Sequence, residues 1–163
     1  WQWTLRTVEW LLAQLPPSSR FQLYIFNTET QPALLGTEGE WLDAADSLVL
    51  EQVVEGIRQY SPGNGTSLIN AINSINDFED LPDNMFILTD GLPTQGQAPP
   101  KKYMVSGQQR RSFFAKALAD LPGGMPVNTI LFPMEGDPEA AALFWQLGVN
   151  SQGAFIAPSR DWP

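Results

Sequence analysis

The hydrophobic residues along the chain follow two spacings in turn, one typical of helices and one typical of buried strands. Apolar residues recur at helical spacing in five segments, which predicts helices at 1–15, 41–60, 68–78, 114–121 and 138–147. Short, almost unbroken apolar runs lie between these segments and predict strands at 20–27, 84–89, 126–132 and 153–157. The run at 31–36 contains Pro32, which lacks a backbone donor, so it predicts a short edge strand.

This alternation of helices and short apolar strands predicts the fold class. Strands separated by helices form parallel sheets, so we expect an α/β fold with a doubly wound, mostly parallel sheet and helices on both faces. The 163 residues suit a single domain, 1–163, and an apolar content of 43% is enough for a core. In such sheets ligands bind beyond the carboxyl ends of the strands, so chemistry is expected in the loops at that edge.

Two finer expectations concern the last helix and the tryptophans. Asp137-Pro138-Glu139 has the order of an N-cap, a first helical residue and an acidic first turn, so Asp137 is expected to cap this helix. Phe144 and Trp145 are expected to face inward. Apart from Trp162, the tryptophans are expected in the core because most of them lie on apolar helical faces.

The chain contains no cysteine and no histidine, which excludes several classes of chemistry. A disulfide, a thiolate zinc site, an iron–sulfur centre and a Ser-His-Asp triad all need one of these two residues. Any metal would be held by oxygen ligands alone, which favours Mg²⁺, Mn²⁺ or Ca²⁺.

The charge of the chain is acidic but unevenly distributed. The formal net charge is −9, which disfavours general binding to nucleic acid. The segment 91–119 contains no acidic residue and five basic ones: Lys101, Lys102, Arg110, Arg111 and Lys116. This segment is interpreted either as a solvated loop or as a docking patch for an acidic partner. No apolar run reaches the roughly 18 residues that a membrane-spanning helix needs.

Two short segments at the predicted ligand edge carry polar groups suited to chemistry. In Gly65-Thr66-Ser67, glycine permits a tight turn, and the Thr66 hydroxyl could face a cation or cap the next helix. In Thr89-Asp90-Gly91, a carboxylate follows a buried strand, which suits a ligand of a hard cation. The structural alternatives are a simple N-cap at Thr66 and a simple Asp-Gly turn at Asp90. The proline-rich segment that follows Asp90 argues against a hairpin there.

Together these residues resemble the von Willebrand factor type A domain family. The resemblance rests on the strand at 20–27, the Gly-Thr-Ser-Leu segment at 65–68, and the strand with its Thr-Asp-Gly turn at 84–94. The end of the chain, from 129 to 163, looks like the last helix and strand of bacterial members. The resemblance covers almost the whole chain, and it implies a Rossmann-like sheet that carries a metal-ion-dependent adhesion site.

The resemblance also implies roles for individual residues. Thr66 would be the direct hydroxyl ligand of the metal, and Asp90 a second acidic group that often acts through a coordinated water. Gly65, Ser67 and Gly91 would support them, and an acidic residue of a protein partner would complete the shell. The family also places a D-x-S-x-S stretch at the end of the first strand, and this sequence contains none. Without those ligands, we expect Mg²⁺, Mn²⁺ or Ca²⁺ to bind weakly or not at all.

The same departure changes the expected architecture. The chain begins where the helix after that motif should begin, so we expect the domain to lack the first strand and to be N-terminally incomplete. A lost central strand leaves a gap lined by unpaired backbone groups, unless a separate segment fills it. A missing upstream segment would be compatible with a protein that is extracytoplasmic or anchored to a membrane.

The leading hypothesis for function is a non-enzymatic module that binds a protein partner at the strand-end edge. Lys101, Lys102, Arg110 and Arg111 follow Asp90 in the chain, and this basic loop is expected to help select an acidic partner. One alternative is a metal-assisted hydrolase that uses Asp90, although neither loop has a histidine, a cysteine or a pair of carboxylates nearby. Another alternative is a structural scaffold in which Thr66 caps a helix and Asp90 forms a turn.

Overall fold

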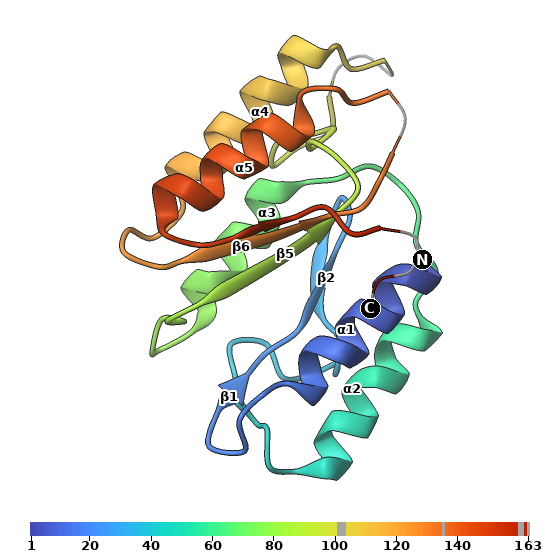
Figure 1. Cartoon of the computed structure of the whole chain (residues 1–163), viewed down its shortest axis with the longest axis vertical. Helices are drawn as coiled ribbons and strands as arrows, with labels where there is room; N and C mark the ends of the chain where they lie inside the picture. The colour runs from blue at the N-terminus through green and yellow to red at the C-terminus, as the bar shows by residue number, and fades with distance from the viewer. Residues whose placement is uncertain (101–103, 135, 160–161, 163) are drawn as a thin grey trace.

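The computed structural model describes residues 1–100, 104–134, 136–159 and 162 (Figure 1). In chain order its elements are α1 (Gln2–Ala13), β1 (Arg20–Phe21), β2 (Tyr24–Phe26), β3 (Thr30–Pro32), β4 (Leu42–Asp43), α2 (Ser47–Gln59), α3 (Leu68–Asn73), the 3₁₀ helix η1 (Ser74–Asp77), β5 (Met85–Thr89), α4 (Gly107–Ala119), β6 (Val127–Leu131), α5 (Ala140–Ser151) and β7 (Phe155–Ile156). Each segment that the hydrophobic spacing predicts overlaps an element of the predicted kind, although α4 begins seven residues before the predicted 114–121. Within the described part of the chain, no helix has the length and apolar character needed to cross a membrane.

The C-terminal part of the fold is a parallel sheet covered by helices. Its strands lie in the order β5–β6–β7, and the ladder between β5 and β6 runs from Met85↔Val127 to Thr89↔Leu131. Helices α3, α4 and α5 share one core with β5 and β6, made of Leu68, Ile72, Ile87, Leu92, Phe114, Ala117, Val127, Leu131, Ala140, Phe144 and Leu147 (Figure 1). These contacts confirm the α/β class and the parallel strands.

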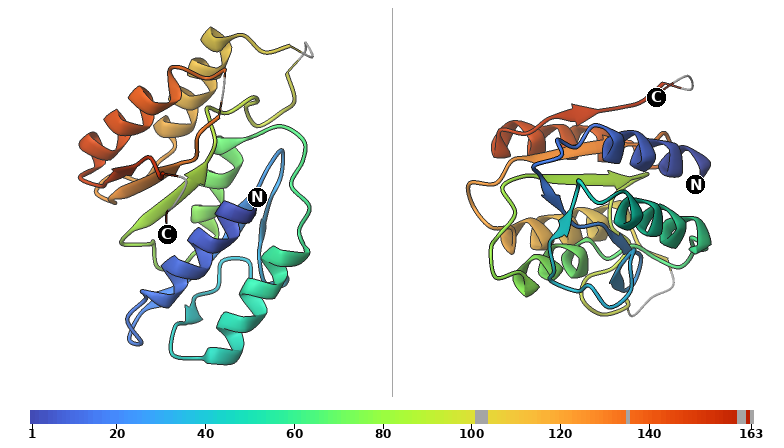
Figure 2. Two further views of the ribbon diagram at one scale, coloured as in Figure 1. Left: turned by 45° about the vertical axis from the view of Figure 1, so that its right-hand side comes forward. Right: turned by 90° about the horizontal axis from the view of Figure 1, so that it is seen from below.

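The N-terminal part has shorter strands and a core of its own. β2 pairs antiparallel with β3, and β1 pairs antiparallel with β4. Helices α1 and α2 lie side by side next to these strands (Figure 2). The buried residues of this core are Val8, Phe21, Ala33, Leu42, Ala44, Val53 and Ile57. Among the described strands β3 pairs with β2 alone, which confirms the edge strand predicted near Pro32.

The two parts are held together at the carboxyl ends of β2 and β5. Just after β2, the carbonyl of Asn27 accepts the N–H of Ser67 at 2.6 Å. Beyond β5, the N–H groups of Thr94 and Gln95 donate to the carbonyl of Thr66, at 2.9 and 3.1 Å. One loop therefore holds both strand ends at the same edge. No backbone ladder joins β2 to β5 in the described residues, so the strands form three separate sheets rather than one continuous sheet.

The strand expected at 20–27 is interrupted at Gln22. The Gln22 side chain donates from Nε2 to the carbonyls of Thr37 and Glu40, at 2.7 and 3.0 Å. Its Oε1 accepts the N–H of Leu23 at 2.8 Å. These side-chain bonds take the place of ladder bonds, so β1 and β2 are separate strands.

The helix expected at 41–60 begins later, at Ser47. Asp46 is its N-cap, and the Asp46 carboxylate accepts the N–H groups of Leu48 and Val49. Trp41 lies before this cap and packs against Phe78, with ring centroids 4.6 Å apart. The apolar spacing continues through the cap into β4, and for this reason the spacing alone placed the helix start too early.

The expectations for the last helix were partly wrong. α5 begins at Ala140 with Glu139 as N-cap and no side-chain capping bond, because the Asp137 carboxylate is engaged elsewhere. Phe144 is buried as expected, but Trp145 is 58% exposed. Adjacent helical residues point about 100° apart, and in α5 this turns Phe144 toward the core and Trp145 toward solvent. Trp1 and Trp10 are also among the exposed large hydrophobic residues, so the expectation of a tryptophan-rich core was wrong for these three.

Candidate functional site

Three loops meet at the carboxyl-end edge of β2 and β5. Besides the backbone bonds of Thr66, the Thr66 N–H donates to Thr94 Oγ1 at 2.8 Å. The carbonyl of Thr28 accepts Nδ2 of Asn70 at 2.9 Å and Nε2 of Gln95 at 3.4 Å. The loop after β2, the loop before α3 and the loop after β5 are therefore tied into one network, which we call the edge network.

Ser67, rather than Thr66, caps α3. The buried Ser67 Oγ accepts the N–H of Asn70 at 3.3 Å and donates to the carbonyl of Gly96 at 2.8 Å. The interpretation of Thr66 as a helix cap is therefore wrong. The Thr66 side chain is half-buried, and its hydroxyl forms no hydrogen bond with another described residue. The sequence could not decide between the two neighbouring hydroxyls, because both stand before the apolar helical stripe.

Gly65 is required by close packing within the edge network. A Cβ at this position would lie 2.7 Å from Thr94 Oγ1, the atom that accepts the Thr66 N–H. A side chain there would therefore displace Thr94 and loosen the loop that carries Thr66. This steric role is separate from the support of a metal ligand that the resemblance implies for Gly65, which stays a prediction.

Asp90 stands exposed directly after β5. Thr89 Oγ1 donates to the carbonyl of Gly91 at 3.0 Å and accepts its N–H at 3.4 Å, which closes a tight turn around Asp90. The next strand, β6, runs parallel to β5 after the intervening α4, so this Asp-Gly pair is not a hairpin turn. The Asp90 carboxylate forms no ion pair or hydrogen bond with another described residue.

The structure places the two predicted arginines in ion pairs with residues that precede α5. Arg110 Nη2 lies 2.8 Å from Asp137 Oδ2, and these side chains are only 15% and 6% exposed. Arg111 Nη1 lies 2.8 Å from Glu139 Oε1, and these side chains are 51% and 41% exposed. Lys101 and Lys102 lie outside the described residues. The interpretation of 91–119 as a free basic patch therefore needs correction, because two of its five cations are offset by acids distant in the sequence.

Asp137 makes contacts at this edge that sequence reasoning missed. It looked like a helix cap, whereas it contacts Arg110 and the backbone that follows Asp90. A single acid 27 positions from its partner leaves no local signal. The sequence contains one hint: the segment 91–119 has five basic residues and no acidic one, so any ion pair it forms needs an acidic residue from another part of the chain.

The residues at this edge do not fit a tight metal site. In the described part of the chain no group of three or more histidine, cysteine, aspartate or glutamate residues could hold a metal ion. Thr66 and Asp90 offer one hydroxyl and one carboxylate, while Asp137 is committed to Arg110. Mg²⁺ prefers about six oxygen ligands in near-octahedral geometry. We therefore derive no chemistry through a metal at this edge.

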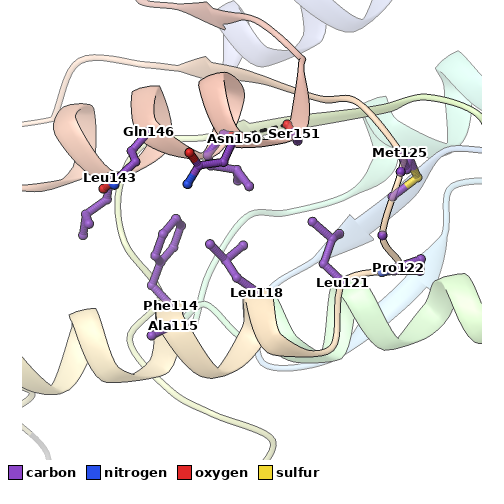
Figure 3. Close-up of a pocket in the computed structure, with 13 residues that line it drawn as sticks. Phe114, Ala115, Leu118, Leu121, Pro122, Met125, Leu143, Gln146, Asn150 and Ser151 are labelled. Atoms are coloured by element: carbon purple, nitrogen blue, oxygen red, sulfur yellow. Dashed lines mark hydrogen bonds between the residues drawn. The ribbon is translucent and has the colours of Figure 1, made fainter.

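A concave region lies between α4 and α5, away from this edge (Figure 3). Its volume is about 480 Å³, and its walls include Phe114, Leu118, Leu121, Leu143 and Leu147, with Gln146, Asn150 and Ser151 among the polar groups. None of the residues that line it carries an ionisable side chain. A groove of this kind offers neither a general acid nor a general base, so it does not support a catalytic function.

Comparison with known proteins supplies a fold relationship. The sequence matches no protein-family model and no curated protein. Among solved structures it is similar to a von Willebrand factor type A protein from Catenulispora acidiphila, with a TM-score of 0.72 and 13% sequence identity. The match covers 97% of this chain and 34% of that protein, so the chain spans about a third of its length. At this identity the likeness concerns the arrangement of the backbone, and it agrees with the parallel sheet and flanking helices described above. The chain therefore has the fold of a von Willebrand factor type A domain.

Proposed function

We propose that the domain is a non-enzymatic protein-interaction module that binds its partner at the carboxyl-end edge of β2 and β5. One observation carries this proposal: the edge network fixes the loops of Thr66 and Asp90 while engaging neither of these two side chains among the described residues. Polar groups on fixed loops lose little conformational freedom on binding, so they are suited to recognition. The likeness to a von Willebrand factor type A fold supports the same conclusion.

The partner chemistry follows from the remaining basic residues. Arg110 and Arg111 already face carboxylates, so selection of an acidic partner rests on Lys101 and Lys102, which follow the Asp90 loop in the sequence. Charge reversal at both lysines is expected to lower the affinity for an acidic partner, and most strongly at low salt, because exposed charges are screened as ionic strength rises. Affinity that does not change at low salt would contradict this part of the proposal.

The metal-dependent form of such a module is the less favoured version of the proposal. With the Thr66 hydroxyl and the Asp90 carboxylate as the ligands that the described residues offer at the two predicted positions, Mg²⁺, Mn²⁺ or Ca²⁺ should bind no tighter than about millimolar. Isothermal titration calorimetry of the purified chain with each ion measures this dissociation constant directly. Tighter binding that disappears in Asp90→Ala would restore the metal-dependent form.

Selection from a displayed library of random peptides tests the site itself. Peptides enriched on the domain should lose at least about tenfold in affinity on Asp90→Asn and on Thr66→Val, since each change removes one polar group at nearly constant shape. Glu51→Gln on the exposed surface of α2 is the matched control and should leave binding unchanged. Peptides that bind all variants equally would place recognition elsewhere, and a failure to enrich any peptide would favour a purely structural scaffold.

A further inference from the structure

The buried ion pair between Arg110 and Asp137 differs from its neighbour between Arg111 and Glu139. Both pairs join α4 to the segment before or at the start of α5, and both have a nitrogen–oxygen distance of 2.8 Å. Only the first is withdrawn from solvent, at 15% and 6% exposure. Withdrawing two charges from water is costly unless their remaining hydrogen-bonding groups are also satisfied. The structure shows where those groups are used.

Both members of the buried pair hold the backbone of one residue, Leu92. Asp137 Oδ2 accepts the Leu92 N–H at 2.7 Å. Arg110 donates to the Leu92 carbonyl from Nε at 3.2 Å and also from Nη2. The Leu92 side chain is buried in the core shared by α3, α4 and α5. The backbone and the side chain of Leu92 are thus both fixed, two positions after Asp90.

The turn itself packs directly on the ion pair. A Cβ at Gly91 would lie 2.7 Å from Asp137 Oδ2 and 3.1 Å from Arg110 Nη2. Only glycine allows this approach without a shift of the pair. On the other side, Thr89 Oγ1 bonds both backbone groups of Gly91. Asp90 therefore lies between two anchors, although its own carboxylate has no partner among the described residues.

We infer that Arg110 and Asp137 are positioning residues, and that together they clamp the Asp90 turn in the orientation that it presents at the binding edge. The inference rests on the proposed function, since it gives a role to the turn that carries Asp90. Arg110 does not meet the partner in this account, which replaces the contact role expected from its position in the basic segment. Arg110 belongs to α4 and Asp137 to the segment before α5. The orientation of the Asp90 turn therefore depends on the relative position of these two elements.

Spin labelling tests the clamp in the free domain. The chain has no cysteine, so Asp90→Cys provides a single site for a nitroxide whose electron paramagnetic resonance spectrum reports the order of the turn. Adding Asp137→Asn, which nearly conserves shape, is expected to raise the mobile fraction of the label at least about twofold. Arg110→Lys should act in the same direction, because an ammonium keeps the charge but not the forked donation to Leu92. Glu139→Gln and Arg111→Gln are the matched controls and should leave the spectrum unchanged.

Amide exchange provides a second measurement in the same variants without the label. The Leu92 N–H should exchange at least about tenfold faster in Asp137→Asn, while buried amides of β6 keep their protection. Unchanged exchange and unchanged label mobility would overturn the inference, and so would an equal response in the Glu139→Gln control. Neither measurement needs a partner, so a failure of the clamp can be distinguished from a failure of peptide binding at Asp90.

Discussion

The two parts of the molecule differ in how their strands are supported. β6 pairs on both of its edges, and four of its five residues are buried. Among the described strands β2 pairs on one edge only, and each of its three residues is half-buried. The two longest strands, β5 and β6 with five residues each, lie in the C-terminal part, whereas β1 to β4 and the C-terminal edge strand β7 have two or three residues.

This difference indicates where the stability of the domain resides. Local opening costs more free energy where backbone bonds are buried and paired on both sides. Asp90 follows β5, which pairs along five residues with the doubly paired β6, whereas Asn27 follows β2, which pairs along three residues with the edge strand β3. The edge network therefore joins a longer ladder to a shorter one, and the predictions below test that contrast.

The largest effect is expected from Phe144→Ala in the C-terminal core. The rings of Phe144 and Phe114 meet edge to face with centroids 4.9 Å apart, and the site is fully enclosed. Removing the ring should lower the free energy of unfolding by about 3–5 kcal/mol, measured by urea denaturation with circular dichroism. Trp145→Ala on the same helix, an exposed position, should change it by less than about 0.5 kcal/mol. Similar losses in both variants would contradict the described burial.

Two glycines allow the same steric perturbation in each part. A Cβ at Gly153 would overlap the carbonyl oxygen of Val127 in β6, and a Cβ at Gly56 would overlap that of Ala33 beside β3. Gly153→Ala should cost about 1–3 kcal/mol of unfolding free energy, because β6 cannot move away. Gly56→Ala should cost less, since an edge strand can shift and alanine favours α2 by about 1 kcal/mol. Gly123→Ala, where no atom lies within 4 Å, is the control. The reverse order would show that the N-terminal part is the more rigid one.

Helix caps provide a comparison that strand support should not affect. Ser106 caps α4 in a capping box with Gln109, and Asp46 caps α2. Replacing either residue with alanine should cost about 1 kcal/mol, measured by urea denaturation. Ser112→Ala on the exposed surface of α4 serves as the control. If amide exchange in Asp46→Ala accelerates only in α1, α2 and β1 to β4, the two parts unfold separately rather than together.

The smallest effect is a pH dependence in the N-terminal part. Burial raises the pKa of the Tyr24 phenol, the hydrogen bond from the Gly39 N–H at 2.9 Å partly opposes this, and Asp77 and Glu38 raise it further. The folded state thus binds the phenolic proton more tightly than the unfolded state does. The resulting stability is fully present below about pH 10 and is lost as pH rises through the raised pKa.

Urea denaturation at several pH values between about 8 and 11 measures this slope. The slope should become shallower in Tyr24→Phe and should persist in Tyr60→Phe, which removes the hydroxyl that Asn27 contacts. An identical slope in Tyr24→Phe would assign the effect to other groups.

The sequence predicted most where structure depends on local spacing. The runs at 84–89 and 126–132 became β5 and β6 almost unchanged. Most of 126–132 is buried, as an unbroken apolar run predicts, whereas in 84–89 only Ile87 is buried and Phe86 is 46% exposed. Thr66 and Asp90 were correctly expected on loops that lie at one edge, since parallel strands bring their carboxyl ends together. The hydrogen bond from the Thr66 N–H to Thr94 Oγ1, which links the two loops, could not be predicted from the spacing of apolar residues.

Two of the failures share one physical cause, which is contact between residues distant in the chain. Gln22 interrupts a strand by donating hydrogen bonds to Thr37 and Glu40. Asp137 does not cap α5 but forms an ion pair with Arg110. Local propensity describes what a residue can do and cannot indicate which partner engages it. For the same reason the sequence did not indicate that Arg110 and Arg111, two cations of the basic segment, form ion pairs with Asp137 and Glu139.

The unpaired strand edges have a thermodynamic consequence. In the described part of the chain, β2 and β5 each have one edge without a ladder partner. Any extended segment that pairs there binds the folded state and not the unfolded one. Mass action then raises the free energy of unfolding, by about 2.7 kcal/mol when that segment is present at roughly 100 times its Kd. When such a segment is present, the melting temperature of the domain rises with its concentration, so two preparations that differ in that concentration would not share one value.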